Sequence, residues 1–197
     1  MKLEPKVLEG RVVRLEPFAP ELREAVRGAL DCDSEAWALI TVSGQGDRFP
    51  GWWRGVLDDV ARGERIAYAV RRLSDGAVVG TTSYLNIRAD HRGVEIGSTF
   101  YRPDTRGGAV NPECKLLLLE HAFAAGALRV ELVTGSRNLR SQAAIAKLGA
   151  VREGVLHKHK VTWIGEVRDT VVFSITDEEW PAVRAGLETR LAALNSG

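Results

Sequence analysis

The sequence predicts an α/β (α+β) fold with a mixed, mostly antiparallel central sheet and helices on both faces. Three β-rich segments, at 66–71, 77–87 and 94–101, follow one another without a helix between them, and a turn sequence at 74–76 joins the first two. Consecutive strands of this kind are typical of an antiparallel meander. A helix then separates the third strand from a strand at 129–134, and such a crossover favours a parallel pair. A purely parallel sheet fits poorly because the middle strands lack intervening helices.

The N-terminal part of the chain predicts a strand, a helix and a loop. Valine, arginine and leucine alternate over 11–15 as they do in a strand. Pro20 opens a helix that we expect to reach about Leu30. The stretch 31–49 is rich in Gly, Ser and Asp, so we expect it to form a loop.

A second helix is expected over 52–61. Trp52 and Val56 recur at helical spacing, and Gly63 ends the pattern. Two adjacent tryptophans on one helix cannot both face the core, so we expect Trp52 or Trp53 to be exposed or to line a cleft.

The C-terminal half begins with a strong helix start. Asn111 is expected to cap a helix that has Pro112 at its first position, an acid in its first turn and its end near Ala125. The remaining elements are expected to be a helix at 138–148, a β-pair at 151–163 and 167–175, and a helix at 177–194.

Composition limits the class of protein. The chain has 197 residues, 45% hydrophobic and 27% charged, which we interpret as one globular domain over 1–197. A net charge of +1 without a run of like charges argues against nucleic-acid binding. No apolar segment is long enough for a membrane span, and the N-terminus lacks a signal core. Cys32 and Cys114 form no metal-binding pair, and the four histidines show no ligand spacing, so we expect no metal and a cytoplasmic location.

The segment with the clearest chemical meaning is 95–111. A strand leads into a short loop that contains Gly107 and Gly108, and the loop leads into a helix. Successive backbone N–H groups of such a loop converge on an anion, and the helix dipole adds to the attraction. A second helix start at Asn138 follows one strand later, so both helix starts should lie at the same edge of the sheet.

These features together resemble the GNAT acetyltransferase superfamily, and in particular its RimJ/RimL-like branch, the ribosomal-protein-alanine acetyltransferases. The resemblance runs from about Leu8 to Trp180. It rests on the Glu95-Ile96-Gly97 strand, on Asn138-x-x-Ser141 leading to Lys147-Leu148-Gly149, on Arg152-Glu153-Gly154-Val155-Leu156, and on Arg168-Asp169 followed by Val171-Val172-Phe173-Ser174 and Glu179-Trp180.

The resemblance implies that acetyl-CoA is the co-substrate. Its pyrophosphate would be held by the backbone amides of Arg106, Gly107, Gly108, Ala109, Val110 and Asn111. This loop departs from the family pattern at Thr105, Ala109 and Asn111, and Ala109 is tolerable there if its φ stays negative. The thioester oxyanion would be held by a backbone N–H where the strand splays, near Thr99, Phe100 and Tyr101.

The resemblance also implies catalytic residues. Asn138 matches the residue that meets the pantetheine arm, and Ser141 matches a residue near the thiol. Many GNAT enzymes have an acidic tyrosine where this chain has Ile145, so Ser141 or water would protonate the thiolate. Glu95 matches the family carboxylate, and we expect it to accept the proton of the attacking amine. Direct attack in a ternary complex is implied, without an acyl-enzyme.

The acceptor pocket is expected to use Trp52 and Trp53 together with His157 and His159. The two histidines are two residues apart on one strand and should share a face. This face is either a solvated strand edge or a surface that contacts an acidic acceptor or the co-substrate.

Three functions remain open at this stage. The first is acetylation of a protein N-terminus, and the second is acetylation of a small amine such as a polyamine, an amino acid or an antibiotic. The third is a non-catalytic module that binds acyl-CoA. A homodimer is compatible with each of them, but no stripe of residues specifies an interface.

Overall fold

The computed structural model describes residues 1–195 and contains one eight-stranded sheet with the order β1-β2-β3-β4-β5-β6-β8-β7. The parallel pair is β5–β6, and the other neighbouring strands pair antiparallel, which confirms the predicted meander and crossover. The strands are β1 (Leu8–Glu9), β2 (Val13–Pro17), β3 (Arg65–Arg72), β4 (Val78–Arg88), β5 (Gly93–Tyr101), β6 (Arg129–Gly135), β7 (Val151–Val161) and β8 (Val167–Thr176).

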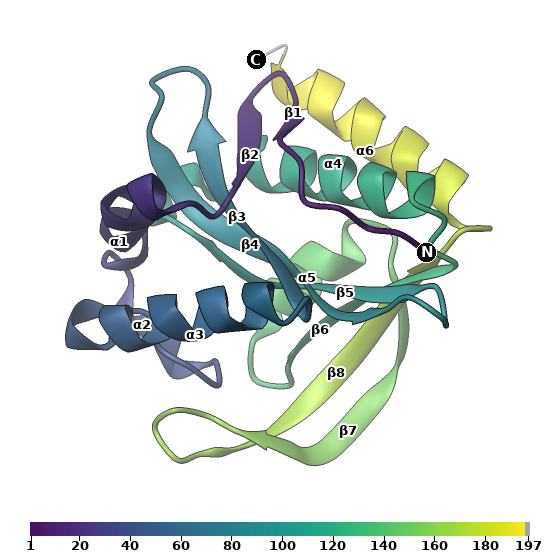
Figure 1. Ribbon diagram of the computed structural model, residues 1–197. Helices are drawn as coiled ribbons and strands as arrows, with labels where there is room; N and C mark the ends of the chain where they lie inside the picture. Colours follow the sequence, from purple (N-terminus) through teal and green to yellow (C-terminus); the bar gives the residue numbers. More distant parts are fainter. Residues whose placement is uncertain (196–197) are drawn as a thin grey trace.

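Helices cover both faces of this sheet, as predicted (Figure 1). One face holds α1 (Arg23–Leu30), α2 (Ser34–Ala38) and α3 (Phe49–Ala61), with short 3₁₀ turns at Pro20–Leu22 and Gly46–Arg48. The other holds α4 (Val110–Ala124), α5 (Leu139–Ala146) and α6 (Trp180–Asn195). None of the helices within residues 1–195 combines the length and the apolar character that a membrane crossing needs.

Strand β3 lies between the two hydrophobic cores. Ile66, Tyr68 and Val70 belong to the cluster beneath α4 and α6, while Ala67 and Ala69 belong to the cluster beneath α1 and α3. This alternation follows from the two-residue period of a strand.

The expected loop over 31–49 is wrong, because this stretch contains α2 and a 3₁₀ turn. Asp33 caps α2 by accepting the backbone N–H of Ala36 at 3.1 Å. Trp37 is 2% exposed and stacks on Phe100 with ring centroids 4.8 Å apart. The single large apolar residue anchors a segment whose overall composition is that of a loop.

The expectation that one of the two adjacent tryptophans is exposed is also wrong. Trp52 is 9% exposed and Trp53 is 6% exposed. Phe18 stacks on Trp53 at 4.8 Å, and the edge of Trp37 meets Trp52 at 6.5 Å. Phe18, which precedes α1, and Trp37, which follows it, therefore bury the side of α3 that its helical pattern predicts to be exposed.

The expectation that Asn111 caps α4 is wrong. The helix begins at Val110, so Asn111 lies inside its first turn, and the capping position belongs to Ala109 without a side-chain hydrogen bond. The acid in this turn, Glu113, has a different role from dipole compensation. It is 5% exposed and reaches across to the start of β2.

Glu113 ties α4 to the N-terminal strands. Its carboxylate accepts the backbone N–H groups of Arg11 at 2.9 Å, Val12 at 2.7 Å and Val13 at 2.7 Å. A Cβ on Gly10 would lie 2.4 Å from the carboxyl carbon, so glycine is required at that position. Three charge-assisted hydrogen bonds compensate the burial of the carboxylate.

We expect Glu113→Gln to destabilise the protein by about 3 kcal/mol, because the amide turns an NH₂ group toward backbone donors and loses the charge. Urea unfolding monitored by circular dichroism measures the change. Glu120→Gln, on an exposed part of the same helix, is the control and should change stability by less than about 0.5 kcal/mol. Equal effects of the two substitutions would contradict the anchoring role.

Candidate active site

The centre of the site is the place where β5 and β6 part. The two strands pair only through Gly93 with Arg129, Val94 with Val130 and Glu95 with Glu131. Beyond these pairs β5 continues to Tyr101 and β6 to Gly135 without bonding to each other. The facing edges therefore keep backbone donors and acceptors that an extended ligand with amide groups can satisfy.

A β-bulge in β5 follows directly. Ser83 pairs with Gly97 and Thr81 with Phe100, so Ser98 and Thr99 together oppose a single residue of β4. Ser98 has φ +47°, a left-handed conformation. The bulge lies where the sequence predicts that the strand splays, and it turns backbone N–H groups out of the regular ladder with β4. Contact of these groups with a thioester oxygen stays a prediction.

The three residues expected beside the thioester differ in accessibility. Thr99 is exposed, whereas Phe100 is 7% exposed and packs on Trp37. The phenol oxygen of Tyr101 is buried, and burial raises its pKa well above the ordinary value. Phe100 and Tyr101 can therefore meet a ligand only through their backbones.

The loop before α4 has the geometry of an anion site. Gly107 adopts φ +81°, and Ala109 adopts φ −77°, as the tolerance of alanine there requires. Within residues 1–195, the backbone N–H groups of Gly107, Gly108 and Ala109 bond no backbone acceptor. They precede the N-terminus of a 15-residue helix, whose dipole favours negative charge.

Two side chains hold this loop in position. The Thr105 hydroxyl donates to the carbonyl of Arg102 at 2.8 Å and closes the 3₁₀ turn at Pro103–Thr105. Arg106 forms an ion pair with Asp33, the capping residue of α2. The amides of Gly107, Gly108 and Ala109 thus stay available, whereas the expectation for Arg106 is wrong, because its backbone N–H donates to the carbonyl of Pro103 at 3.2 Å and closes the 3₁₀ turn.

Glu95 lies at the last paired position before the strands part. Its side chain accepts a hydrogen bond from Asn86 Nδ2 at 2.7 Å and is 6% exposed as a residue. A Cβ on Gly97 would lie 2.8 Å from Glu95 Oε1, so the glycine leaves room for the carboxylate. Burial raises the pKa of Glu95, and the Asn86 hydrogen bond and the Lys160 charge oppose this effect. A carboxylate with a raised pKa is suited to accept a proton near neutral pH.

The charges around Glu95 are mostly paired with one another. Glu131 accepts from Arg88 and Arg129, and Arg129 also binds Glu153. Within the described chain, no cation forms an ion pair with Glu95 itself. No local sequence pattern pointed to Asn86 or to these neighbours, because strand register alone brings them together.

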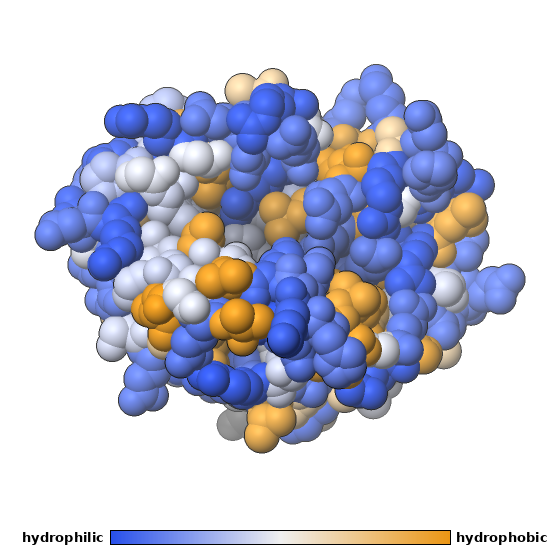
Figure 2. Space-filling view, turned by 90° about the horizontal axis from the view of Figure 1, so that it is seen from below, coloured by the Kyte–Doolittle hydropathy of each residue, from blue (hydrophilic) through white to orange (hydrophobic). Residues whose placement is uncertain are grey.

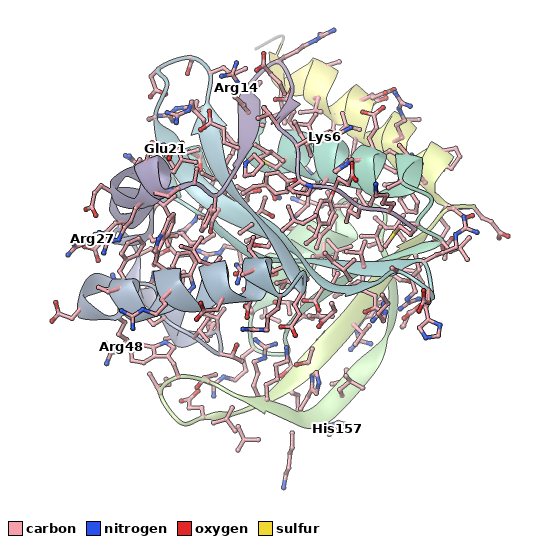
Figure 3. The ribbon with its side chains drawn as sticks, viewed as in Figure 1. Lys6, Arg14, Glu21, Arg27, Arg48 and His157 are labelled. Carbon is pink, nitrogen blue, oxygen red and sulfur yellow. The ribbon has the colours of Figure 1, made fainter. Side chains whose placement is uncertain are left out.

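A cavity of about 180 Å³ lies at the end of β6. It is bounded by Ala38, Leu39, Gly135, Ser136, Arg137, Asn138, Thr162, Glu166, Val167, Arg168 and Asp169. The turn between β7 and β8 closes one end, because Trp163 Nε1 donates to the carbonyl of Trp37 at 2.8 Å. The Arg48 guanidinium lies 4.4 Å over the Trp163 ring, beneath α3 (Figure 3).

Asn138 borders this cavity but has a structural role as well. Its Oδ1 accepts the backbone N–H of Ser141 at 3.1 Å and caps α5, which leaves Nδ2 to meet a ligand. Ser141 is half-buried in the first turn of the same helix. Arg168 also borders the cavity, and its buried Nε has no partner within the described residues.

The four residues expected to bind the acceptor are not gathered in one place. Trp52 and Trp53 belong to α3 and are buried in the core cluster between that helix and the sheet. His157 lies on the outer strand of the hairpin, exposed, with Nδ1 3.4 Å from Asp169 (Figure 3). Lys158 has φ +48°, and the pairing of β7 with β8 shifts register between Leu156 and Lys160. The regular alternation of side chains is interrupted here, so the argument that His157 and His159 share a face no longer holds. Their part in acceptor binding stays a prediction.

We expect Glu95→Gln to raise the midpoint of thermal unfolding at neutral pH. Because the folded-state pKa of Glu95 is raised, folding disfavours the carboxylate above that pKa and favours the neutral acid below it. The amide removes the cost while still accepting from Asn86. The gain should shrink as the pH falls toward the ordinary glutamate range, and a midpoint that is unchanged or lower at neutral pH would contradict it. Scanning calorimetry at several pH values measures both.

Comparisons with known proteins show which family the chain is similar to. The family model described as Acetyltransferase (GNAT) domain matches residues 13–151, more than half of the chain. A candidate acetyltransferase of known structure from T. thermophilus is 36% identical, with 97% of this chain and 100% of that chain covered and a TM-score of 0.86. A GCN5-related N-acetyltransferase from Brucella melitensis is 27% identical, with 95% and 86% covered and a TM-score of 0.86.

A more distant structure shares the fold. Mycobacterium smegmatis RimJ, solved in complex with CoA-disulfide, is 23% identical, with 94% of this chain and 93% of that chain covered and a TM-score of 0.78. No curated protein sequence matches the chain. The extent of the family match and the 36% identity over nearly the full length identify the chain as a member of the GNAT family and an acetyl-CoA-dependent N-acetyltransferase.

Proposed function

We propose that this protein transfers the acetyl group of acetyl-CoA to the α-amino group of a protein N-terminus, as enzymes of the RimJ/RimL-like branch do. The observation that carries the proposal is the parting of β5 and β6 immediately after Glu95. The glycine loop of α4 lies on one side of this point, and an open face of the sheet lies on the other. The co-substrate and the acceptor can thus approach the same carboxylate from opposite faces.

The residues assigned to acetyl-CoA form a continuous path. The backbone amides of 107–111 receive the pyrophosphate at the N-terminus of α4, and Asn138 meets the pantetheine arm through Nδ2. The free backbone edges of β5 and β6 pair with the amides of the arm. The bulge at Ser98 and Thr99 then lies beside the thioester.

Glu95 accepts the proton of the amine, directly or through a water molecule, because only the neutral amine has the lone pair needed for attack. The amine nitrogen forms a bond to the thioester carbon, and the carbonyl electron pair moves to oxygen, where a backbone N–H of the bulge stabilises it. The carbonyl re-forms as the C–S bond breaks, and the sulfur keeps the electron pair of that bond. The thiolate then takes a proton from Ser141 or water, and the excess proton that the attacking nitrogen still carries passes back to that group, so that a neutral amide and a neutral thiol leave.

An acyl-enzyme on cysteine is not supported. Burial raises the pKa of Cys114 to about 12, so its thiolate is not populated near neutral pH. Cys32 is exposed as a residue, but partial desolvation of its thiol also raises the pKa of that thiol. Both thiols are free, which supports a cytoplasmic location for the reaction.

An extended polar acceptor suits the open face of the sheet. The helices α1, α2 and α3 cover β3, β4 and part of β5 but leave the β6–β8 part of that face uncovered (Figure 1). Seen from the hairpin side, the surface is mostly hydrophilic, with separate hydrophobic patches and a recess near its centre (Figure 2). The fold likeness to RimJ supports the same choice. The small cavity beside Asn138 favours the second candidate, a small amine.

The first test is calorimetric titration with acetyl-CoA. Gly107→Asp should weaken binding at least tenfold, because a carboxylate enters the proposed phosphate loop. Gly107→Asn is the matched control, since asparagine has the same shape, tolerates a positive φ and carries no charge. It should weaken binding much less. Equal losses would mean that the loop shape, not its charge, is responsible, and no binding to the wild type would refute the proposal.

The second test is turnover, measured as release of the CoA thiol. Peptides with a free N-terminus should be acetylated, and the same peptides with a blocked N-terminus should not. Glu95→Gln should lower kcat by about 100-fold and should remove the rise of activity with pH that deprotonation of Glu95 produces in the wild type. Turnover of polyamines or amino acids without turnover of any peptide would replace the proposed acceptor with a small amine.

A further inference from the structure

Two buried cations reach the bulge of β5 from opposite faces of the sheet. Arg65, at the start of β3, is 7% exposed and donates through Nη2 to the Ser98 hydroxyl at 2.8 Å. Lys115, in α4, is 5% exposed and donates through Nζ to the Thr99 hydroxyl at 3.0 Å. Each of the two bulge residues is thus held by its own buried cation.

The two cations belong to different cores. Arg65 also donates to Ser83 at 2.9 Å and lies 3.9 Å from Asp59 of α3. Lys115 lies on α4, on the other face of the sheet, where its neighbour Cys114 belongs to the hydrophobic cluster beneath α4 and α6. It therefore shares a face with the glycine loop, and it follows Val110, the first residue of the helix, by five positions.

Lys115 has no carboxylate to balance its charge within residues 1–195. Glu113, two residues earlier, is occupied by the backbone of 11–13. Burial raises the pKa of Cys114 to about 12 and that of Tyr101 well above its ordinary value, so both are neutral near pH 7. Burial lowers the pKa of Lys115 to about 8. An unbalanced buried ammonium is costly, so its retention points to an anion that arrives from outside the protein.

Negative charge develops beside the bulge only during the reaction. The hydroxyl of Thr99 also lies 2.9 Å from that of Thr82, so the threonine is held from two sides while its own residue stays exposed. A charge delivered through such a held hydroxyl needs no reorganisation when the substrate ionises.

We propose that Lys115 is a positioning residue for acetyl transfer, which holds Thr99 and directs positive charge at the bulge so that the departing CoA thiolate is stabilised. Arg65 acts in the same way through Ser98 from the other face. As the C–S bond breaks, the sulfur keeps the electron pair, and the nearby cations lower the affinity of that thiolate for a proton. The inference rests on the proposed function.

The test measures the thiol pKa of bound CoA by the ultraviolet absorbance of its thiolate. The proteins carry Cys32→Ser, and S-methyl-CoA supplies the background, since it has no titrating thiol. Binding to the parent protein should lower the thiol pKa by about one pH unit, and Lys115→Met should abolish most of this shift. Lys2→Met, which removes an exposed lysine, is the control and should keep it.

Kinetics give an independent readout. Lys115→Met should lower kcat by about tenfold with little change in the KM for acetyl-CoA. Wild-type activity should fall above about pH 8 as Lys115 loses its proton, and Lys115→Arg, which keeps the charge at any pH used, should lack that fall.

Thr99→Val provides the second variant, because Thr99 is exposed and its loss should not prevent folding. It should remove part of the thiol shift. If Lys115→Met binds CoA and lowers its thiol pKa as much as the parent protein does, the inference is wrong but the proposed function stands. If Lys115→Met does not fold, the same result with Thr99→Val leads to the same conclusion. Absence of CoA binding to the parent protein would overturn the proposed function and the inference with it.

Discussion

The parting of β5 and β6 is the constraint on which the rest of the site depends. Three residue pairs hold the strands together, and the next residues of both strands keep backbone groups without a partner in the sheet. Buried strand edges need hydrogen-bond partners, so the gap is stable only if solvent or a ligand supplies them. The bulge at Ser98 keeps the two strands from closing on each other, since it bends β5 away and disrupts its register with β4.

Helix α4 connects the parts of the site. Its N-terminus follows the glycine loop, Glu113 in its first turn binds the backbone of 11–13, and Lys115 one residue beyond Cys114 binds the bulge. The positive end of the helix and the ammonium act on one face of the sheet, where a large anion is expected to bind. A displacement of this helix would therefore disturb the loop and the bulge together, which gives the anchor at Glu113 a functional meaning.

The buried charged residues near the site differ in their effect on stability. The Glu113 carboxylate is fully hydrogen-bonded and contributes to stability. The side chains of Glu95 and Lys115 have one hydrogen bond each and no ion pair within the described chain. Burial raises the pKa of Glu95 and lowers that of Lys115, so both values move toward pH 7. Such groups lower stability, and proteins retain them where the reaction needs a base or a charge near pH 7.

The sequence by itself determined the meander, the crossover and the glycine turn at Gly107, because periodicity and turn chemistry are local properties of the chain. The family was identified from the resemblance of its motifs to the GNAT acetyltransferases. The sequence did not reveal that Trp52 and Trp53 are both buried, since the covering residue Phe18 lies outside their helix. It placed Asn111 as a cap, although the helix starts one residue earlier. Only the tertiary structure brought Arg65 and Lys115 to the same bulge. Their meeting depends on strand register and on the packing of α4, and neither leaves a pattern in a single segment.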